Sequence, residues 1–236
     1  MVPRALEPAG VVLVDKPAGP SSFKVIAAVR RRTGARTGHT GTLDPFATGL
    51  LVVLSGWATK LQPCFVGLDK RYLVDVDLTA TTTTGDPEGE VAERHEPPPV
   101  AVLEQWLAVL RGEIELPIPA ASAVKIGGER AYRLARRGVE VDMPLRRSTV
   151  NALDVISYTD GVARLDLRVT SGTYVRAIAL ALGGHCRTLR RLEVGPFAVD
   201  DAHTEVMLDV GEAFDRLSAE AQAHAPKDAL RRMGRA

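Results

Sequence analysis

The stretch from Gly38 to Gly49 holds the residues whose types and spacing could carry out chemistry. It reads Gly-His-Thr-Gly-Thr-Leu-Asp-Pro-Phe-Ala-Thr-Gly, with one histidine, His39, and one carboxylate, Asp44. Both side chains belong to types that serve in acid–base or covalent catalysis. Pro45 disfavours a helical conformation at Asp44, so this carboxylate is expected on extended or turn backbone. An Asp-Pro pair is also a common helix cap and a lone histidine is common in loops, so the stretch by itself leaves these interpretations open.

Two apolar strands and a helix are expected to position this stretch. Val11 to Val14 is a short apolar run that predicts a buried strand. The turn after it leads to a helix that Ser21 or Ser22 can cap and Gly34 can end. Leu50 to Leu54 is a continuous apolar run between glycines, which predicts a core strand directly after the stretch that carries Asp44.

Further elements follow in an irregular order. Strands and helices alternate without a regular βαβ period, so the predicted fold class is α/β of the α+β kind, with a mixed, largely antiparallel sheet flanked by helices. The domain is expected to end near Asp201. The remaining predictions are strands at Tyr72 to Leu78 and Ala163 to Val169, a loop at Thr81 to Gly89, helices at about 100–110, 130–137 and 174–182 with a strand between the first two, and a helix around Glu205 to Leu217.

Composition excludes several classes of protein. Of 236 residues, 45% are hydrophobic and 25% are charged, as in ordinary globular proteins. No apolar run approaches the roughly 18 residues of a membrane span, so no membrane association is expected. Cys64 and Cys186 are too few and too far apart for a disulfide framework or a four-ligand zinc site, which fits the cytoplasm.

Charge is distributed unevenly, although the formal net charge is only +1. The arginine-rich segments either are solvated helix faces or form a surface for a polyanion. The basic clusters are residues 23 to 37, residues 127 to 148 and the group Arg187, Arg190 and Arg191, while acids gather at Asp86, Glu88, Glu90, Glu93 and Glu96.

A series of short motifs runs in order through residues 11 to 197. It comprises Leu13-Val14-Asp15-Lys16-Pro17, Gly38-His39-Thr40-Gly41-Thr42-Leu43-Asp44-Pro45, Gly49-Leu50-Leu51, Ala58-Thr59-Lys60, Asp69-Lys70-Arg71-Tyr72, Ser122-Ala123-Val124-Lys125, Arg130-Ala131-Tyr132-Arg133-Leu134-Ala135-Arg136, Ser171-Gly172-Thr173-Tyr174-Val175-Arg176 and Leu189-Arg190-Arg191-Leu192. Together these motifs resemble the TruB family of bacterial tRNA pseudouridine synthases. The resemblance covers nearly all of the predicted domain and implies the pseudouridine synthase fold.

The resemblance also implies a reaction, the isomerisation of the T-loop uridine of tRNA conventionally numbered 55. The N1–C1′ bond breaks, the uracil turns within the site, and a C5–C1′ bond forms, with no net gain or loss of atoms. A positioned carboxylate suffices for this chemistry, so we expect no metal and no cofactor. Asp44 matches the family's catalytic aspartate, which would attack the base or the sugar, or act as a base on a glycal-like intermediate.

The same resemblance implies roles for further residues. A buried ionised carboxylate needs a cationic partner, and Arg176 matches the family's arginine for that role. Tyr72 matches the tyrosine that stacks on the extruded uracil. His39 matches a histidine associated with the flipped-out nucleotide, and we expect it to position substrate. The other expected substrate-binding residues are Tyr174, Leu192, which would line the uracil pocket, and Lys16, which with Pro17 would shape the pocket floor.

Two segments outside the central motifs complete the prediction. Residues from about 119 to 147 resemble the family's thumb-like insertion, which closes over the T stem-loop. Its arginines would contact RNA phosphates without reading sequence; they are Arg130, Arg133, Arg136 and Arg137. We expect a catalytic domain at residues 1–201 and a short extension at 202–236, without a full RNA-binding appendage of the PUA type.

Two alternatives remain at this point. The chain could be a non-catalytic RNA-binding or RNA-folding protein that uses the same groove. It could instead be a related synthase that acts on another RNA, because fold and a catalytic aspartate do not determine the substrate. The ordered motifs favour tRNA as the partner of a cytoplasmic enzyme that acts as a monomer.

Overall fold

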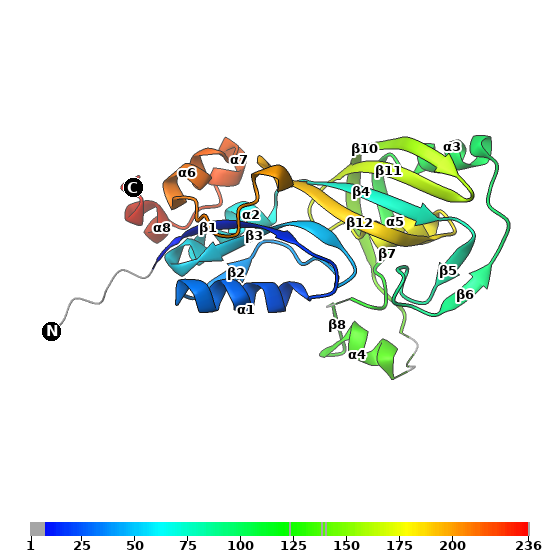
Figure 1. The fold of residues 1–236 in the computed structure, drawn as a ribbon, viewed down its shortest axis with the longest axis horizontal. Coiled ribbons are helices and arrows are strands. Elements are labelled where there is room, and N and C mark those ends of the chain that lie inside the picture. Colours follow the sequence, from blue (N-terminus) through cyan, green and yellow to red (C-terminus); the bar gives the residue numbers. More distant parts are fainter. Residues whose placement is uncertain (1–7, 123, 138, 140, 236) are drawn as a thin grey trace. The chain divides into compact units, whose positions relative to one another are not determined.

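The computed structural model describes residues 8–122, 124–137, 139 and 141–235, without the side chains of Tyr132, Ala135 and Arg136. The chain divides into two compact units, shown in Figure 1. Unit 1 combines the residues up to 71 with those from 190 onward, and unit 2 holds residues 72–189. Asp44 therefore lies in unit 1, which joins the two ends of the chain.

The strands of unit 1 are paired around β3 (Thr48–Ser55), which is buried along almost its whole length. It pairs antiparallel with β1 (Gly10–Lys16) and with β2 (Thr37–His39). It also pairs in parallel with the end of β12 (His185–Val194), at Arg190 with Thr48 and Arg191 with Gly49. The short strand β13 (Phe197–Ala198) returns antiparallel along β12. These pairings confirm the predicted strands at 11–14 and 50–54.

Alternate residues of β1 and β3 pack in two separate clusters. Val12 and Val14 of β1 pack with Ile26 and Val29 of α1 (Ser22–Thr33), and Figure 1 shows α1 beside these strands. The helix begins with Ser21, whose Oγ accepts from the amide of Lys24, and ends at Gly34 with φ of 66°. This confirms the predicted helix and both of its caps. The other helical elements of unit 1 are η1 (Gly56–Leu61), α2 (Gln62–Val66), η2 (Val199–Asp201), α6 (Val210–Asp215), α7 (Ala219–Gln222) and α8 (Lys227–Arg232).

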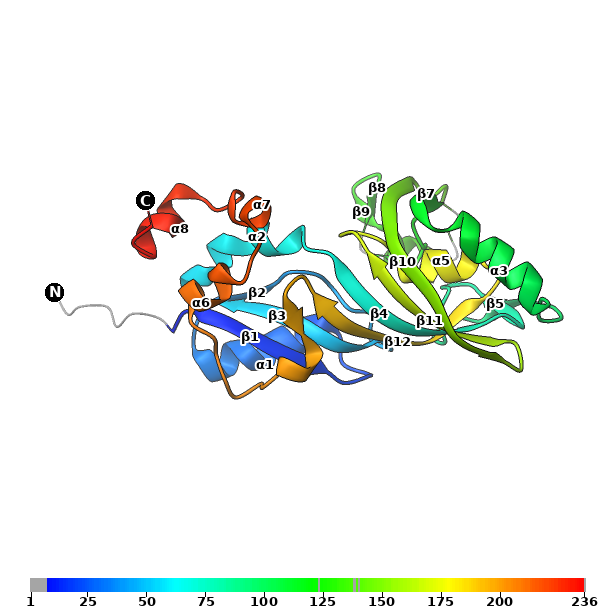
Figure 2. The same cartoon turned by 90° about the horizontal axis from the view of Figure 1, so that it is seen from above.

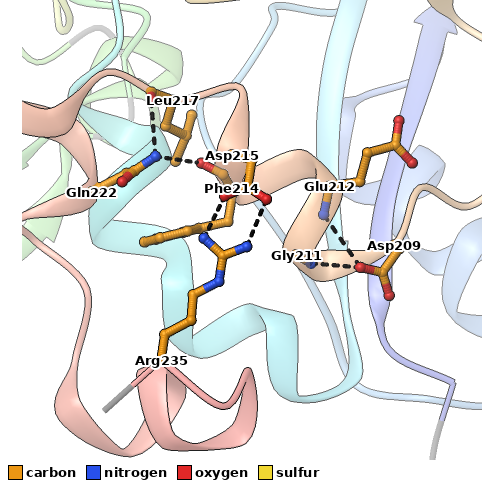
Figure 3. A network of polar contacts seen from close by, with 8 residues as sticks. All are labelled: Asp209, Gly211, Glu212, Phe214, Asp215, Leu217, Gln222 and Arg235. Carbon is orange, nitrogen blue, oxygen red and sulfur yellow. Dashed lines mark hydrogen bonds and ion pairs between the residues drawn. The ribbon is translucent and has the colours of Figure 1, made fainter.

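The C-terminal segment packs in the other cluster, on the residues of β1 and β3 that do not contact α1. Val210, Phe214 and Ala229 are buried there together with Val11 and Leu13 of β1. Figure 3 shows polar contacts within this segment. Arg235 forms an ion pair with Asp215, and its guanidinium lies over the ring of Phe214. In the same network Asp209 caps α6, and the amide of Gln222 donates to the carbonyls of Phe214 and Leu217 at 3.1 and 3.0 Å.

Unit 2 is built on an antiparallel group of strands, of which β10 (Leu145–Thr159) and β11 (Val162–Val169) form a long hairpin, seen in Figure 2. The strand β7 (Gly112–Pro117) pairs with the other edge of β10. The remaining elements are β4 (Lys70–Asp77), the hairpins β5 (Ala80–Thr82) with β6 (Val91–Arg94) and β8 (Lys125–Ile126) with β9 (Glu129–Arg130), and the helices α3 (Val100–Val109), α4 (Ala131–Arg136) and α5 (Val175–Ala181). The hydrogen-bonded strand order is β1-β3-β12-β4-β11-β10-β7, and β12 and β4 have residues in both units.

Several predictions of local structure need correction. The predicted loop at Thr81 to Gly89 begins within β5, because Ala80 and Thr81 pair with Arg94 and Glu93. The predicted helix around 205–217 is helical only in α6; before it, Leu208 exchanges backbone hydrogen bonds with Val11 of β1. Gly138, the expected end of α4, lies outside the described residues, and none of the described helices is long and apolar enough to cross a membrane.

Candidate active site

Asp44 lies in the connection between β2 and β3. The connection makes a tight turn, in which the amide of Ala47 donates to the carbonyl of Asp44 at 3.2 Å. Leu43 and Ala47 are buried on either side, whereas Asp44 itself is only partly covered. No helix begins here, so the interpretation of Asp44-Pro45 as a helix cap is wrong. A half-buried carboxylate thus lies at a turn between two buried residues, within the prediction of extended or turn backbone at Asp44.

Lys16, at the end of β1, holds the backbone on the C-terminal side of Asp44. Its side chain is completely buried, and its Nζ donates to the carbonyls of Ala47 at 2.7 Å, Pro45 at 3.1 Å and Pro17 at 2.9 Å. Three acceptors satisfy the three N–H groups of an ammonium, which is what allows this charge to be buried. Lys16 therefore fixes the backbone of the turn at Pro45 and Ala47.

Arg191, on β12, holds the backbone on the N-terminal side of Asp44. It is 2% exposed, and its guanidinium donates to the carbonyls of Leu50 at 2.6 Å, Gly41 at 3.0 Å and Thr42 at 3.4 Å. The basic cluster at 187–191 was expected to face either solvent or a polyanion, and for Arg191 the structure corrects this. Its charge points inward. Burial of this charge is possible because the planar guanidinium can donate to several carbonyls at once.

Ser22 fixes the residue next to Asp44. Its hydroxyl accepts from the amide of Leu43 and donates to the carbonyl of the same residue, both at 2.8 Å. Ser21 is the helix cap, so of the two serines considered for that role one caps α1 and the other binds the loop that carries Asp44. Lys16, Ser22 and Arg191 together hold backbone groups on both sides of Asp44, and we call residues 40–47 with these three contacts the aspartate loop.

The electrostatic surroundings of the aspartate loop are cationic. Lys70 is buried like Lys16 and Arg191, and donates to the carbonyls of Val66 and Leu68. Burial, together with the charge of Arg191, lowers the pKa of Lys70 to about 8. Burial and then Arg191 likewise lower the pKa of His39 below its usual value of 6.5.

The ring of His39 is therefore neutral at neutral pH, and a hydrogen bond defines its tautomer. The amide of Gly41 donates to its Nδ1 at 3.2 Å, so Nδ1 is unprotonated and the proton is on Nε2. A neutral imidazole held in this way presents one N–H donor, which suits positioning of a neutral substrate group.

Unit 2 contains Tyr72, Tyr174 and Arg176, three further predicted site residues. Tyr72 is buried on β4, Tyr174 precedes α5, and Arg176 is 3% exposed in the first turn of α5. Arg176 donates to the carbonyls of Thr84 at 2.8 Å and Ala121 at 3.0 Å and lies 3.4 Å from the carboxylate of Asp86.

Asp86 lies beside Arg176 and was not expected there, because the sequence analysis counted it among the surface acids. It is 3% exposed, and its Oδ1 accepts from the Thr84 hydroxyl at 2.6 Å and from the Glu88 amide at 3.0 Å. The only signal in the sequence was its place after Gly85, in a run of threonines that offers hydroxyl donors. The structure thus brings Lys16 and Asp44 together in unit 1 and Arg176 and Asp86 together in unit 2.

Comparisons with known proteins show the family of this chain. Residues 29–175 match the family described as TruB family pseudouridylate synthase (N terminal domain). The chain belongs to the TruB family. The tRNA pseudouridine synthase B of Leifsonia xyli subsp. xyli (strain CTCB07) is 43% identical over 221 residues, which are 87% of this chain and 73% of that protein. The protein of the same name from Mycobacterium sp. (strain KMS) is 44% identical over 209 residues, 82% of this chain and 70% of that protein.

A solved structure has a similar fold. In the crystal structure of a Cbf5-Nop10-Gar1 complex, one chain is 27% identical with a TM-score of 0.61, and the match covers 92% of this chain and 59% of that chain. This confirms the predicted pseudouridine synthase fold, a mixed and mainly antiparallel sheet flanked by helices.

Leu192 and the thumb-like segment complete the set of TruB family positions. Leu192 is partly buried against the cluster that contains β1 and β3, directly after Arg191. In the segment, Arg130, Arg133 and Arg137 are exposed, and Arg137 pairs with Glu129 at 2.8 Å. The side chain of Arg136 lies outside the described residues.

Proposed function

We propose that this TruB family member isomerises uridine to pseudouridine in tRNA, at the T-loop position conventionally numbered 55. The observation that carries the proposal is the aspartate loop, in which three polar side chains hold the backbone on both sides of one half-buried carboxylate. Such preorganisation keeps a reactive group in place without rearrangement during the reaction. The two relatives named tRNA pseudouridine synthase B support tRNA as the substrate.

The reaction requires an exchange of bonds at one nucleotide. The N1–C1′ bond breaks, the uracil turns, the C5–C1′ bond forms, and the proton leaves C5 while N1 gains one. The carboxylate of Asp44 serves either as a nucleophile towards the base or the sugar, or as the base that removes a proton. Both roles need a group at a defined position, which the contacts of Lys16, Ser22 and Arg191 provide.

The other site residues bind and orient the nucleotide in this proposal. Tyr72 stacks on the extruded uracil. Arg176, whose guanidinium pairs with Asp86 within unit 2, is assigned to substrate binding. His39, as a neutral ring, orients the flipped-out nucleotide by its Nε2–H. Tyr174 and Leu192 contact the base. Lys16 binds backbone carbonyls of the aspartate loop.

The RNA contacts of the proposal lie on the thumb-like segment. Arg130, Arg133, Arg136 and Arg137 bind phosphates of the T stem-loop and recognise its shape, since phosphate contacts carry no sequence information. The enzyme acts as a monomer in the cytoplasm, without metal or cofactor, so its activity should survive dialysis against a chelator.

The decisive experiment is to incubate the purified protein with an unmodified tRNA transcript and to map pseudouridine. We expect one pseudouridine, at position 55, and none in a transcript that carries cytidine there. Binding of tRNA without pseudouridine at any position would favour an RNA-binding protein without turnover. Pseudouridine formed in another RNA but not in tRNA would favour a related synthase with a different substrate.

A further inference from the structure

The exposed face of α1 is the strongest feature that the proposed site does not use. Ser22, Ile26 and Val29 are its buried residues, with the i, i+4, i+7 spacing of one helix face. The opposite face therefore presents Phe23, Lys24, Ala27, Ala28, Arg30 and Arg31. The helix contains no acidic residue.

The charge on this face exceeds what helix stability requires. One cation in the last turn is enough to interact with the helix dipole, yet Arg30, Arg31 and Arg32 all lie there. Arg32 lies 3.6 Å from the carboxylate of Glu205. Among the residues that the structure describes, no carboxylate pairs with Lys24, Arg30 or Arg31, so these three cations face solvent with their charge uncompensated.

An exposed aromatic ring accompanies these cations. Phe23 is 75% exposed, and Arg30 follows it by two helical turns. Only the small side chains of Ala27 and Ala28 separate the ring from the arginines, so a polymer backbone can approach the helix closely. Cations beside an exposed ring, with small residues between them, match the chemistry of RNA, whose phosphates take the charge and whose bases or riboses take the ring.

The position of α1 connects this face with the aspartate loop. Ser22, the first residue of the helix, binds the amide and the carbonyl of Leu43, next to Asp44. Phe23 and Lys24 follow at once, and the 12 residues of the helix extend about 18 Å from that point. A strand whose target nucleotide lies at Asp44 therefore has its neighbouring nucleotides within reach of this face.

We propose that Phe23, Lys24, Arg30 and Arg31 form an RNA-binding face that contacts the backbone of nucleotides flanking the target uridine. The inference rests on the proposed function, because it takes the strand at Asp44 to be RNA. It adds a contact surface in unit 1 to the thumb-like segment of unit 2. The partner is defined by its chemistry, a polyanionic strand with accessible bases or riboses.

The test measures binding and its salt dependence for two RNAs, the full tRNA transcript and the isolated T stem-loop. For the double variant Arg30→Gln with Arg31→Gln, we expect roughly tenfold weaker binding of both RNAs at low salt. The slope of log K against log salt should fall by about 1.4–1.8, since each lost phosphate contact contributes about 0.7–0.9. Phe23→Ser should weaken binding and leave the slope unchanged, because stacking releases no counterions.

Two controls separate a local contact from net charge. Arg231→Gln with Arg232→Gln makes the same change of charge in the last turn of α8 and should leave the slope unchanged. Arg30→Lys with Arg31→Lys keeps the charge and should keep most of the slope. Binding is measured independently of turnover, so failure of the proposed function would show as absence of pseudouridine, whereas failure of this inference would show in the slopes.

Three results would overturn the inference. The first is wild-type affinity and slope in the Arg30 and Arg31 double variant. The second is an equal loss of slope in the α8 control, which would reduce the effect to net charge. The third is a loss for the full tRNA but not for the stem-loop, which would place the contact far from the target nucleotide.

Discussion

Adjacent arginines on β12 have opposite surroundings. Arg190 is partly exposed and makes a bidentate ion pair with Asp15 at 3.0 and 2.8 Å. Arg191 points inward and binds the carbonyls of Gly41, Thr42 and Leu50. Alternate residues of a strand face opposite sides, so neighbours of the same type can be a surface charge and an internal support.

This contrast gives a prediction for Arg191→Met. The change leaves the carbonyls of Gly41 and Thr42 in the aspartate loop, and that of Leu50 in β3, without their donor. Each unsatisfied buried group costs about 1–3 kcal/mol. We expect the free energy of unfolding to fall by about 3 kcal/mol or more and kcat to fall with it, as measured by urea unfolding and by pseudouridine formation. The matched control is Arg190→Met, which breaks only an exposed pair worth up to about 1 kcal/mol. Equal effects of the two substitutions would refute the supporting role of Arg191.

In the proposed reaction Asp44 supplies the catalytic carboxylate. Asp44→Asn keeps the size of the side chain but removes the ionisable carboxylate, so we expect pseudouridine formation to disappear while the unfolding midpoint and tRNA affinity stay near wild type. The measurement is mapping of pseudouridine after long incubation, with filter binding on the same preparation. Appreciable turnover by the variant would contradict the assigned role.

His39 gives a prediction of pH dependence. Its pKa in the folded protein is below the usual 6.5, so the folded state resists protonation. The contribution of neutral His39 is complete above pH 6.5 and is lost as the pH falls from 6.5 towards the lowered pKa, because the unfolded chain then binds the proton more readily.

The comparison uses His39→Asn, whose amide oxygen can accept from Gly41 as Nδ1 does but does not titrate. We expect the wild type to lose more free energy of unfolding than the variant between pH 7.5 and pH 5. Parallel pH profiles for the two proteins would show that His39 does not titrate in this way.

At the scale of elements, the aspartate loop depends on the close pairing of β3 with β12. Gly49 has a φ of 100°, and a Cβ there would lie 2.2 Å from the carbonyl oxygen of Arg191. Only glycine lets the two backbones approach this closely. The same pairing brings the Arg191 guanidinium to the carbonyls of Gly41 and Thr42 in the aspartate loop.

We therefore expect Gly49→Ala to lower the free energy of unfolding by several kcal/mol or to prevent folding, as judged by soluble yield and thermal unfolding. Gly67→Ala is the control, since a Cβ there would meet no atom of the described residues within 4 Å beyond its chain neighbours, and its φ is −71°. That variant should be as stable as the wild type or slightly more stable. A Gly49→Ala protein with wild-type stability would contradict the described pairing.

At the scale of the whole molecule, unit 1 is closed by residues from both ends of the chain. Ala229 of α8 is fully buried, and Leu230 and Met233 pack on the same cluster. Lys60 of η1 also pairs with Asp228. The C-terminal segment is thus part of the core that carries β1 and β3, and not a diffusely charged tail.

Deletion of the residues from Lys227 onward should therefore reduce stability more than it reduces RNA contacts. We expect the free energy of unfolding to fall by about 2–4 kcal/mol, from the apolar groups of Ala229, Leu230 and Met233 that the deletion removes. The control, Lys227→Gln with Arg232→Gln, removes charge without apolar surface and should change it by no more than about 0.5 kcal/mol. A truncated protein as stable as the control would show that the tail contributes little to the core.

Neighbours in the chain were enough to predict several local elements and to mark Asp44 as the candidate catalytic residue. Apolar runs predicted β1 and β3, a capping serine and Gly34 predicted α1, and Pro45 predicted extended or turn backbone at Asp44, because each of these depends on residues close in sequence. The inward direction of Arg191 and Lys16, the burial of Asp86 beside Arg176 and the packing of the C-terminal helix in a core follow only from the folded chain. They depend on partners far away in the chain, such as Gly41, which is 150 residues from Arg191, and no local pattern records which carbonyl a buried cation will bind.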